Sequence, residues 1–481
     1  MYRYLLRLSG EIALKGRFRG ALERILVGNI SRVLSSDIVD IRRVDGGRIY
    51  VEAKKEVSDV LSRFFGVVEV LEVFVEDSKD LDRLAKRARD LLCGSLNGKR
   101  FAVRARRSGV TGYTSLDAAR IIGGALLECS SGVDLENPDV EVYVEIRGGL
   151  AYISTSLLSR RGYGGLPLGS SEKVLSLFSG GFDSPVATWM AMKRGSPSDL
   201  LHYVMGSLEN TIRALKVGEA LMRKWSLGYE PRVLLVDFSD IVSEIRSKVR
   251  RKLWQPALRR AMYVVGEILM KEVDAEALVT GEAVWEASSQ RLSALYASQK
   301  GIDALILRPL IGFDKVDIMR LSMDIGLYEL SSKVVESCFI GSPNPIYVDA
   351  DELVSEFSKI DRGLFEDVAK SAIEIKYEDG WEEKVRSSMK LYQDVTIDTI
   401  PEGYVVVDIT KRKGSGFIRG LEDLDEMLRR REKIVLVCEL GEASEALARH
   451  LRDQGYEVYS LRGGYKRLKE LLQSKAPPPH S

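Results

Sequence analysis

The stretch Ser179-Gly180-Gly181-Phe182-Asp183-Ser184 has the residue types and spacing of a phosphate-binding turn. An apolar run, 174–178, precedes it as a predicted strand, and a helix-compatible run, 185–193, follows it. Such a turn presents backbone N–H groups to an anion, and glycines let the backbone approach a phosphate closely. Ser179 and Ser184 add hydroxyl donors, and Asp183 can hold Mg²⁺ against the phosphates. It is not a Walker A loop, because no Gly-Lys-Ser/Thr follows, and six residues alone still favour an ordinary turn.

Cys438 is the second candidate for a reactive residue. It ends the predicted strand 434–438 and precedes a predicted helix, 443–454. Backbone N–H groups before a helix stabilise a thiolate, and a thiolate accepts sulfane sulfur as a persulfide. An inert core cysteine is the commoner state of a free thiol. Glu439 and Glu442 lie close by and disfavour a thiolate, which leaves open how readily Cys438 is loaded.

The composition excludes several classes of protein. Lys+Arg number 71 and Asp+Glu 70, so a nucleic-acid surface must be a local patch. Four cysteines are too few for a disulfide scaffold, and without a Cys-x-x-Cys pair and with only three histidines a zinc or iron–sulfur site is not expected. Cys93 and Cys129 lie on apolar faces of predicted helices and are expected to be core residues. No apolar run of about 18 residues and no secretory signal is found, so no membrane contact and a cytoplasmic location are expected.

The alternation of strands and helices predicts an α/β multidomain protein. The 481 residues suffice for roughly three domains of about 150 residues. The expected parts are an α+β unit of ferredoxin type (1–75), a second α+β unit (76–168) ending in a glycine-rich linker (160–167), a doubly wound parallel sheet (169–345), a charged helical connector (346–400), a smaller α/β domain (401–475) and a disordered tail (476–481). In the third part, the strands are predicted at 173–178, 200–205, 231–237 and 276–280. The glycine turn, His202 and the segment 280–282 follow or end these strands, where such sheets bind ligands, although a strand histidine is more often a core residue.

Two basic segments are candidates for RNA contact. Lys15 and Arg17 lie in a glycine-bounded stretch, 10–20, for which a solvated loop and a phosphate contact are equally open. On the predicted strand 100–107, Arg100, Arg104 and Arg106 share one face, and Lys99 and Arg107 flank them. An arginine face is usually only solvated, but this density makes contact with an RNA backbone a serious alternative.

Taken together, these motifs resemble the tRNA 4-thiouridine synthetase family, the tRNA uracil 4-sulfurtransferases that are also tied to thiamine thiazole synthesis. The similar segments cover nearly the whole chain: 6–16, 101–109 (similar to a THUMP RNA-binding domain), 165–169, the PP-loop 179–184, 280–282, 289–290, 308–310, 314–315 and a rhodanese-like loop at 436–444. The combination is far more specific than any single segment.

The resemblance implies an enzyme that cleaves ATP between its α and β phosphates. AMP would be transferred to the C4 oxygen of uridine 8 in tRNA, which turns a poor leaving group into a good one. Asp183 is implied as a metal or catalytic carboxylate, and Lys315 as a cation that offsets charge developing on phosphate. ATP contacts are implied at Leu177, Phe178, Ser179, Gly180, Gly181, Ser184, His202, Tyr203, Arg259, Gly281 and Gln290. Taken alone, Arg259 and Lys315 could equally be solvated surface residues.

The resemblance also implies a sulfur relay. Cys338 would attack the Cys438 persulfide and leave a Cys338–Cys438 disulfide, which a reductant must reopen. A cysteine desulfurase would supply the sulfur, Mg²⁺ would accompany ATP, and the architecture leaves room for a homodimer. Two other functions stay open: sulfur transfer for thiazole synthesis alone, and a tRNA-binding scaffold without catalysis.

Overall fold

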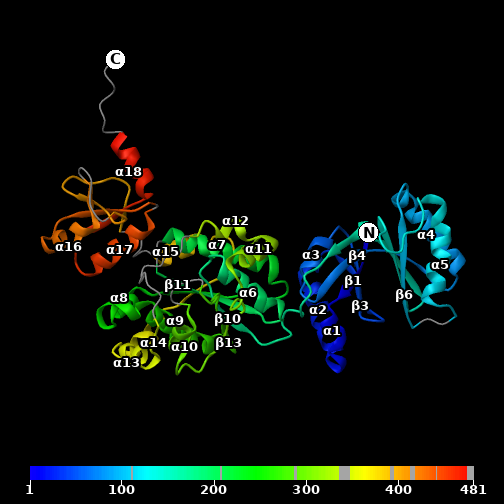
Figure 1. Cartoon of the computed structure of the whole chain (residues 1–481), viewed down its shortest axis with the longest axis horizontal. Coiled ribbons are helices and arrows are strands. Elements are labelled where there is room, and N and C mark those ends of the chain that lie inside the picture. Colours follow the sequence, from blue (N-terminus) through cyan, green and yellow to red (C-terminus); the bar gives the residue numbers. More distant parts are fainter. Residues whose placement is uncertain are drawn as a thin grey trace, which may run out of the picture. The chain divides into compact units, whose positions relative to one another are not determined.

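The computed structural model describes residues 1–109, 112–205, 208–285, 290–334, 347–389, 395–411, 418–439 and 441–473 (Figure 1). Cys338 and the expected tail, 476–481, therefore lie outside the described residues. The chain forms two compact units: unit 1 holds residues 1–172, 191–197 and 223–230, and unit 2 holds the rest. None of the described helices is long and apolar enough to cross a membrane.

Unit 1 begins with a five-stranded antiparallel sheet in the order β2-β3-β1-β4-β9. Its strands are β1 (Tyr2–Leu8), β2 (Ile38–Val44), β3 (Arg48–Ala53), β4 (Val67–Glu72) and β9 (Ser159–Arg161). Helices α2 (Arg19–Val33) and α3 (Ser58–Arg63) supply Leu26, Ile30 and Leu61 to a core shared with Tyr4 and Leu6. Leu5 and Tyr50, whose side chains point to the opposite face, belong to a second core cluster with Leu71 and Tyr152, so β1 and β3 are buried on both faces.

Two expectations for this sheet are corrected. The stretch 10–20 is no loop: it forms α1 (Gly10–Leu14) and a 3-10 turn (Gly16–Phe18) before α2 starts at Arg19. The expected linker 160–167 begins inside β9, which pairs with β4 at the sheet edge. This edge pairing joins residues about 90 positions apart in sequence, so local composition does not reveal it.

The second sheet of unit 1 has the order β5-β8-β7-β6, with β6 and β7 parallel. Its strands are β5 (Phe74–Asp77), β6 (Phe101–Ser108), β7 (Val140–Arg147) and β8 (Leu150–Thr155). Helices α4 (Leu81–Leu96) and α5 (Ser115–Leu126) lie side by side against it (Figure 1), and Thr114 and Asp117 close a capping box at the start of α5. The apolar run 67–75 is divided between β4 and β5, which belong to the two different sheets.

Cys93 and Cys129 were expected to be core residues, but this prediction is wrong: they form a disulfide. The bond joins the last turns of α4 to the 3-10 turn after α5 (Leu127–Cys129), and the two Cα atoms lie 5.3 Å apart. The packing of α4 against α5 creates this proximity between residues 36 positions apart. Two helix faces read separately cannot indicate it.

Unit 2 contains a six-stranded sheet in the order β14-β13-β10-β11-β12-β15. The strands are β10 (Val174–Leu177), β11 (Ser198–Val204), β12 (Val233–Asp237), β13 (Ala277–Val279), β14 (Leu305–Leu307) and β15 (Ile373–Ile375). All neighbours are parallel except β15, and β11 is buried along its whole length, as expected of a strand covered on both faces. The main surrounding helices are α6 (Asp183–Lys193), α7 (Leu208–Trp225), α8 (Ser239–Lys248), α9 (Trp254–Glu272), α10 (Leu292–Gln299), α11 (Lys315–Asp324) and α12 (Tyr328–Ser331).

The segment expected as a helical connector belongs largely to this domain. Strand β15 pairs with β12, and α13 (Ala350–Phe357) and α14 (Arg362–Lys370) place Leu353, Phe357 and Phe365 in the same core as β10 and β11. Helix α15 (Trp381–Ser388) follows, with Trp381 buried. The abundance of charge in this segment concealed the narrow apolar stripes that anchor its helices.

The last sheet is parallel throughout, in the order β16-β20-β19-β17-β18. Its strands are β16 (Thr396–Ile397), β17 (Val405–Asp408), β18 (Ile418–Gly420), β19 (Ile434–Val437) and β20 (Val458–Leu461), and its helices are α16 (Leu421–Arg429), α17 (Glu442–Asp453) and α18 (Gly464–Gln473). Val407, Leu436 and Ala448 lie at the centre of its core. Cys438 follows β19 directly, as the sequence predicts.

Candidate functional site

The glycine turn connects the end of β10 to the first residue of α6, as the sequence predicts. The Ser184 hydroxyl accepts the N–H groups of Ser179, at 2.9 Å, and Gly180, at 3.2 Å. The two serine hydroxyl oxygens lie 3.1 Å apart. Ser184 therefore shapes the turn from within, and an anion would draw on the N–H groups that follow Gly180, at the start of α6.

Close contacts require glycine at two positions of the site, Gly180 and Gly281. Gly180 has a φ of +80°, and a Cβ on it would lie 2.5 Å from the Ala214 Cα on α7. A Cβ on Gly281, in the loop after β13, would lie 2.7 Å from the Ser184 backbone nitrogen. Only glycine permits these approaches. The structure thus brings the 280–282 segment directly against the start of α6.

Asp183 and Lys315 meet across 132 positions of sequence. The Lys315 Nζ lies 3.2 Å and 3.4 Å from the two carboxylate oxygens of Asp183, and both side chains are partly exposed. Lys315 also lies 5.7 Å from the centre of the Phe182 ring. The pair places one carboxylate and one ammonium group beside the glycine turn, where both can reach a bound phosphate.

A single carboxylate is an adequate protein ligand for Mg²⁺ when phosphates complete the shell. Among the described residues, no group of three or more His, Cys, Asp or Glu side chains could hold a metal by itself. The Asp183 carboxylate fits a metal ion that is brought to the site with a phosphate ligand. Asp183 is the residue that would hold it.

His202 and Tyr203 are turned inward by their own hydrogen bonds. The His202 Nδ1 lies 2.8 Å from the Phe178 carbonyl oxygen, and because a carbonyl only accepts, Nδ1 carries the proton. Burial lowers the pKa of His202, so the ring is neutral at neutral pH. The Tyr203 hydroxyl donates to the Met262 carbonyl at 2.5 Å. A ligand at the ends of β10 and β11 would meet backbone atoms at these positions rather than the two side chains.

Glu282 is the most densely bonded acidic residue near the turn, and the sequence reasoning did not single it out as a site residue. Its two oxygens lie 2.6 Å from the Arg259 Nε and 2.7 Å from the Arg308 Nε. Tyr263 and Thr280 donate their hydroxyls to the same carboxylate. Burial by itself would raise the pKa of Glu282, but the two guanidinium groups hold it below the usual value.

Two predicted site residues, Arg259 and Gln290, lie in or next to this cluster. Arg259 has a side chain only 14% exposed, so the alternative of a solvated helix face is wrong for it. The Gln290 side-chain oxygen accepts the Ala283 N–H at 3.2 Å and ties down the loop that starts at Gly281. Two sequence signals could have revealed Glu282. It is adjacent to Gly281, and both Glu282 and Arg308 lie in segments that resemble the family.

Cys438 lies in a cradle of donors at the start of α17. Its Sγ accepts the N–H groups of Gly441, at 3.2 Å, and Ser444, at 3.4 Å, and the Ser444 hydroxyl at 3.4 Å. The thiol is buried, whereas Glu439 is exposed. The side chain of Glu442 and the whole of Cys338 lie outside the described residues. This geometry suits a sulfur that must carry negative charge.

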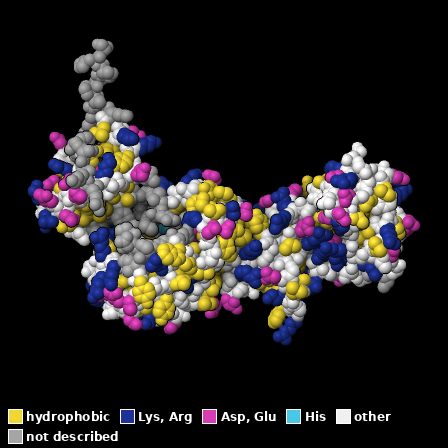
Figure 2. Space-filling view, in the orientation of Figure 1, with side chains coloured by type: hydrophobic (Ala, Val, Ile, Leu, Met, Phe, Trp, Pro, Cys, Tyr) yellow, Lys and Arg dark blue, Asp and Glu magenta, His cyan; other side chains and the backbone are white. Residues whose placement is uncertain are grey.

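The predicted basic face of β6 is partly neutralised. Arg100 pairs with Asp134 at 2.7 Å, and Arg104 pairs with Glu141 at 2.8 Å. In Figure 2, Lys and Arg side chains of unit 1 are correspondingly interspersed with acidic ones. The remaining candidates vary in exposure: Lys99 is half-buried, and Lys15, Arg17, Arg106 and Arg107 are exposed.

A hollow of about 540 Å³ lies along this strand. It is lined by Arg7 of β1 together with Arg104, Arg106, Ser115, Leu116, Tyr143 and the acidic Glu141 of the second sheet and α5. Arg7 is an addition that the sequence reasoning missed, because it comes from the other sheet. The hollow joins cations from both sheets of unit 1 and is a candidate contact for nucleic acid.

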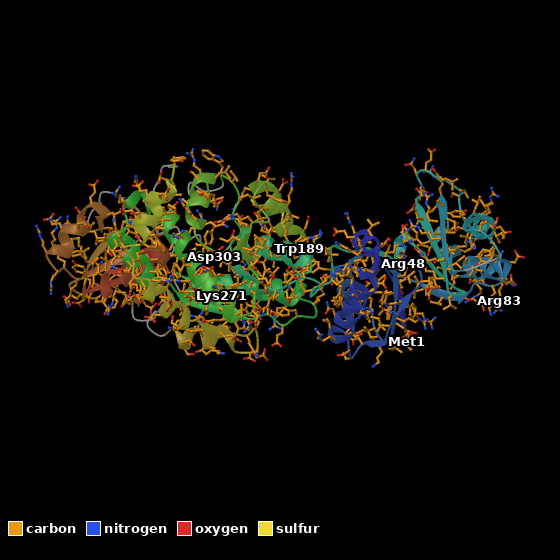
Figure 3. The ribbon with its side chains drawn as sticks, turned by 90° about the horizontal axis from the view of Figure 1, so that it is seen from below. Met1, Arg48, Arg83, Trp189, Lys271 and Asp303 are labelled. Atoms are coloured by element: carbon orange, nitrogen blue, oxygen red, sulfur yellow. A yellow bond between two sulfur atoms is a disulfide. The ribbon has the colours of Figure 1, made fainter. Side chains whose placement is uncertain are left out.

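A buried ion cluster connects these two sheets. Glu145 of β7 contacts the Arg7 Nε at 3.2 Å, the Arg48 Nη2 at 3.1 Å and the guanidinium of Arg147. Arg7 also pairs with Glu69 at 2.6 Å. Figure 3 shows Arg48 where the strands of the first sheet approach the second. The cluster ties both sheets into one unit.

Comparison with known proteins places each part of the chain. Family models match at residues 3–70 (ThiI ferredoxin-like domain), 78–156 (THUMP domain), 169–360 (thiamine biosynthesis protein, ThiI) and 399–471 (rhodanese-like domain). A tRNA sulfurtransferase from Desulfurococcus amylolyticus is 40% identical over 98% of this chain and 99% of its own. The chain belongs to the tRNA sulfurtransferase family. The resemblance inferred from the motifs and the predicted fold class, with its ferredoxin-like, THUMP, parallel-sheet and rhodanese-like parts, are therefore confirmed.

Two further relatives extend the comparison. The crystal structure of a 4-thiouridine synthetase–RNA complex with bound ATP matches 78% of this chain and 99% of its own with a TM-score of 0.66 and 29% identity. A probable tRNA sulfurtransferase from Sulfurisphaera tokodaii is 37% identical over 95% of its own length but only 74% of this chain. The Sulfurisphaera relative is therefore shorter than this chain, whereas the Desulfurococcus relative is of similar length.

Proposed function

We propose that this chain catalyses the ATP-dependent thiolation of tRNA, replacing O4 of uridine 8 by sulfur to give 4-thiouridine. The observation that carries the proposal is the Asp183–Lys315 pair beside the glycine turn, in a chain that also holds Cys438 in a cradle of donors. The match to a 4-thiouridine synthetase bound to RNA and ATP supports the same conclusion.

The first step is activation of the base by a PP-loop ATP pyrophosphatase centre. The C4 oxygen attacks the α phosphorus of ATP, pyrophosphate leaves, and the oxygen becomes bonded to AMP. Lys315 offsets charge that develops on the phosphates. Asp183 would hold a Mg²⁺ ion, which would supply charge neutralisation to the leaving pyrophosphate. The 280–282 loop, fixed by Glu282 through Arg259 and Arg308, closes one side of the phosphate site. Backbone atoms at 177–178 and 202–203 meet the nucleotide.

The second step transfers sulfur. The terminal sulfur of a Cys438 persulfide attacks C4, and AMP leaves with the former base oxygen. The thiolate of Cys338 attacks the Cys438 sulfur, which releases the terminal sulfur to the base and leaves a Cys338–Cys438 disulfide. An external reductant then reopens the disulfide, and a cysteine desulfurase reloads Cys438. In an alternative second step, the Cys338 thiolate attacks the Cys438 sulfur first, which forms the same disulfide and releases sulfide, and this sulfide then attacks C4 as AMP leaves.

The grip on tRNA is assigned to unit 1, through the cations of the hollow beside β6 and the exposed Lys15 and Arg17. Such contacts are made to phosphates, so tRNA selection rests on shape more than on base reading. A homodimer, in which one subunit grips the tRNA that the other modifies, is compatible with this scheme.

The proposal is tested by supplying ATP, Mg²⁺, a sulfur donor and unmodified tRNA and measuring 4-thiouridine absorbance. We expect product with wild type and none with Asp183→Ala or Cys438→Ser. Asp317→Ala is the matched control, because Asp317 is an exposed acid on α11, the helix that begins with Lys315, and should leave thiolation intact. Product from Asp183→Ala would refute the nucleotide site. Product from Cys438→Ser with added sulfide but not with a persulfide donor would replace the persulfide step by the sulfide route.

A second candidate function is sulfur delivery for thiamine thiazole synthesis, because the model that matches residues 169–360 describes a thiamine biosynthesis protein. The two functions differ in their need for RNA. ATP turnover that requires unmodified tRNA favours thiolation, whereas sulfur transfer from Cys438 without tRNA or ATP favours the thiazole function.

A further inference from the structure

Trp285 is an exposed tryptophan in an unusual backbone conformation. Its side chain is 62% exposed, and its φ is +68°, a region that bulky residues rarely adopt. All five tryptophans of the chain lie within the described residues, and the other four are buried or half-buried. The indole of Trp285 therefore adds little to the core, although the backbone that presents it is strained.

The surroundings hold the indole in place. The Arg291 guanidinium carbon lies 4.1 Å from the ring centre, and the Arg291 Nε is buried with no hydrogen-bond partner in the described part of the chain. The Trp285 N–H donates to the Gln290 carbonyl at 3.3 Å, and the Val284 N–H donates to the Ile311 carbonyl at 3.3 Å. A cation on the ring and two backbone bonds fix an aromatic surface that solvent can reach.

The position of this surface follows from the loop that carries it. Gly281 packs against Asp183 and Ser184, and Trp285 follows it by four residues. Four residues span at most about 14 Å, so the indole is within reach of a nucleotide that is activated beside the Asp183–Lys315 pair. Arg291 adds a positive charge at the same place, which suits a polyanion.

We propose that Trp285, backed by Arg291, is a stacking platform for a base of the bound RNA at or next to the nucleotide that is activated. The inference rests on the proposed thiolation of tRNA. An adenine of ATP is the rival ligand, but small ligands are usually enclosed over most of their surface, which an indole so exposed does not provide. A base that belongs to an RNA can be covered on its other face by the RNA itself. Stacking on an aromatic ring also does not depend on the identity of the base.

The experiment compares Trp285→Phe, which keeps a stacking ring, with Trp285→Ala, which removes it. Tyr296→Ala is the control, because Tyr296 is 63% exposed on the nearby helix α10. We expect Trp285→Ala to raise the KM for tRNA roughly five- to one-hundred-fold, the range of one lost base stack, and to leave the KM for ATP unchanged. Trp285→Phe should recover most of this loss, and Tyr296→Ala should behave as wild type.

Fluorescence supplies an independent measurement, because Trp285 is exposed whereas the other tryptophans are buried or half-buried. Unmodified tRNA should quench the emission of wild type, and this quench should disappear in Trp285→Phe. A quench by ATP alone, or a KM for tRNA within twofold of wild type in a folded Trp285→Ala, would overturn the proposal. If wild type produced no 4-thiouridine but kept a tRNA-dependent quench that Trp285→Phe abolished, the stacking site would stand and the thiolation function would fall.

Discussion

Replacement of Glu282 by glutamine tests whether the carboxylate holds the nucleotide site together. In the wild type, one oxygen faces donors from Arg259 and Tyr263, and the other faces donors from Arg308 and Thr280. A glutamine places an NH₂ group on one of these sides, so a donor must oppose donors at less than 3 Å whichever way the amide turns. No rotamer of the new side chain relieves both sides.

The expected magnitude follows from burial. The side chains of Arg259, Arg308 and Glu282 are 14%, 15% and 9% exposed, so solvent screens their charges little. Breaking a buried ion pair by removing one partner costs about 3–5 kcal/mol, because the other charge stays buried. At about 2–4 °C per kcal/mol for a domain of this size, the melting transition should fall by roughly 6–20 °C.

Denaturant unfolding followed by tryptophan fluorescence measures the effect in the full chain. Four of the five tryptophans, all except Trp225, belong to unit 2, so the signal reports mainly on that unit. Glu426→Gln is the matched control: Glu426 pairs with Arg430 on the surface, where both side chains are about two-thirds exposed, and its loss should not shift the midpoint measurably.

The pH dependence has a defined sign. The pKa of Glu282 in the folded protein is lowered below the usual 4.5, so its stabilising contribution is complete above pH 4.5 and is lost as the pH falls through the lowered value. The gap in stability between wild type and Glu282→Gln should therefore narrow in acid. A midpoint for Glu282→Gln equal to that of wild type at neutral pH would refute the reasoning, and so would a gap that widens as the pH falls.

Three other perturbations have defined outcomes. Glu145→Gln should destabilise unit 1 by about 3–5 kcal/mol, because it leaves Arg7, Arg48 and Arg147 buried without their shared carboxylate, and hydrogen exchange in β1 and β7 should rise together. Cys93→Ser should cost about 2–4 kcal/mol by removing the crosslink to Cys129, and wild type treated with a reductant should lose the same amount, while Cys93→Ser itself should be insensitive to the reductant. Ser444→Ala should slow alkylation of Cys438 by iodoacetamide about tenfold at neutral pH, since a hydrogen bond to a charged sulfur is worth about 1.4 kcal/mol or more, and an unchanged rate would show that the backbone donors suffice.

Local patterns predicted the elements whose partners are near in sequence or whose faces are uniformly apolar. The buried run of β11 and the start of α6 after the glycine turn are of this kind. The edge strands β9 and β15 were missed because each is only three residues long and pairs with a strand that is distant in sequence. The disulfide was missed for the same reason, since neither cysteine belongs to a recognisable pair motif.

The nucleotide site shows the same division. Strand order brings the glycine turn and Gly281 to one sheet edge, a consequence that parallel α/β topology makes predictable. The ion pairs of Glu282 were not predictable, because they depend on which side chains are buried together and not on a spacing in the sequence. The resemblance implied Arg259 as an ATP contact, but its pairing with Glu282 beside Arg308 arises only when α9 and the segment after β14 fold over the same carboxylate.

Cys438 shows why local charge in a sequence is a poor guide to thiol chemistry. In the sequence, Glu439 is the adjacent residue and argues against a charged sulfur. In the fold, Glu439 is exposed to water, which screens it, whereas the N–H groups of Gly441 and Ser444 contact the Sγ directly inside the buried loop. The Sγ of Cys438 therefore contacts N–H donors at 3.2–3.4 Å rather than the neighbouring carboxylate, and only the fold reveals these contacts.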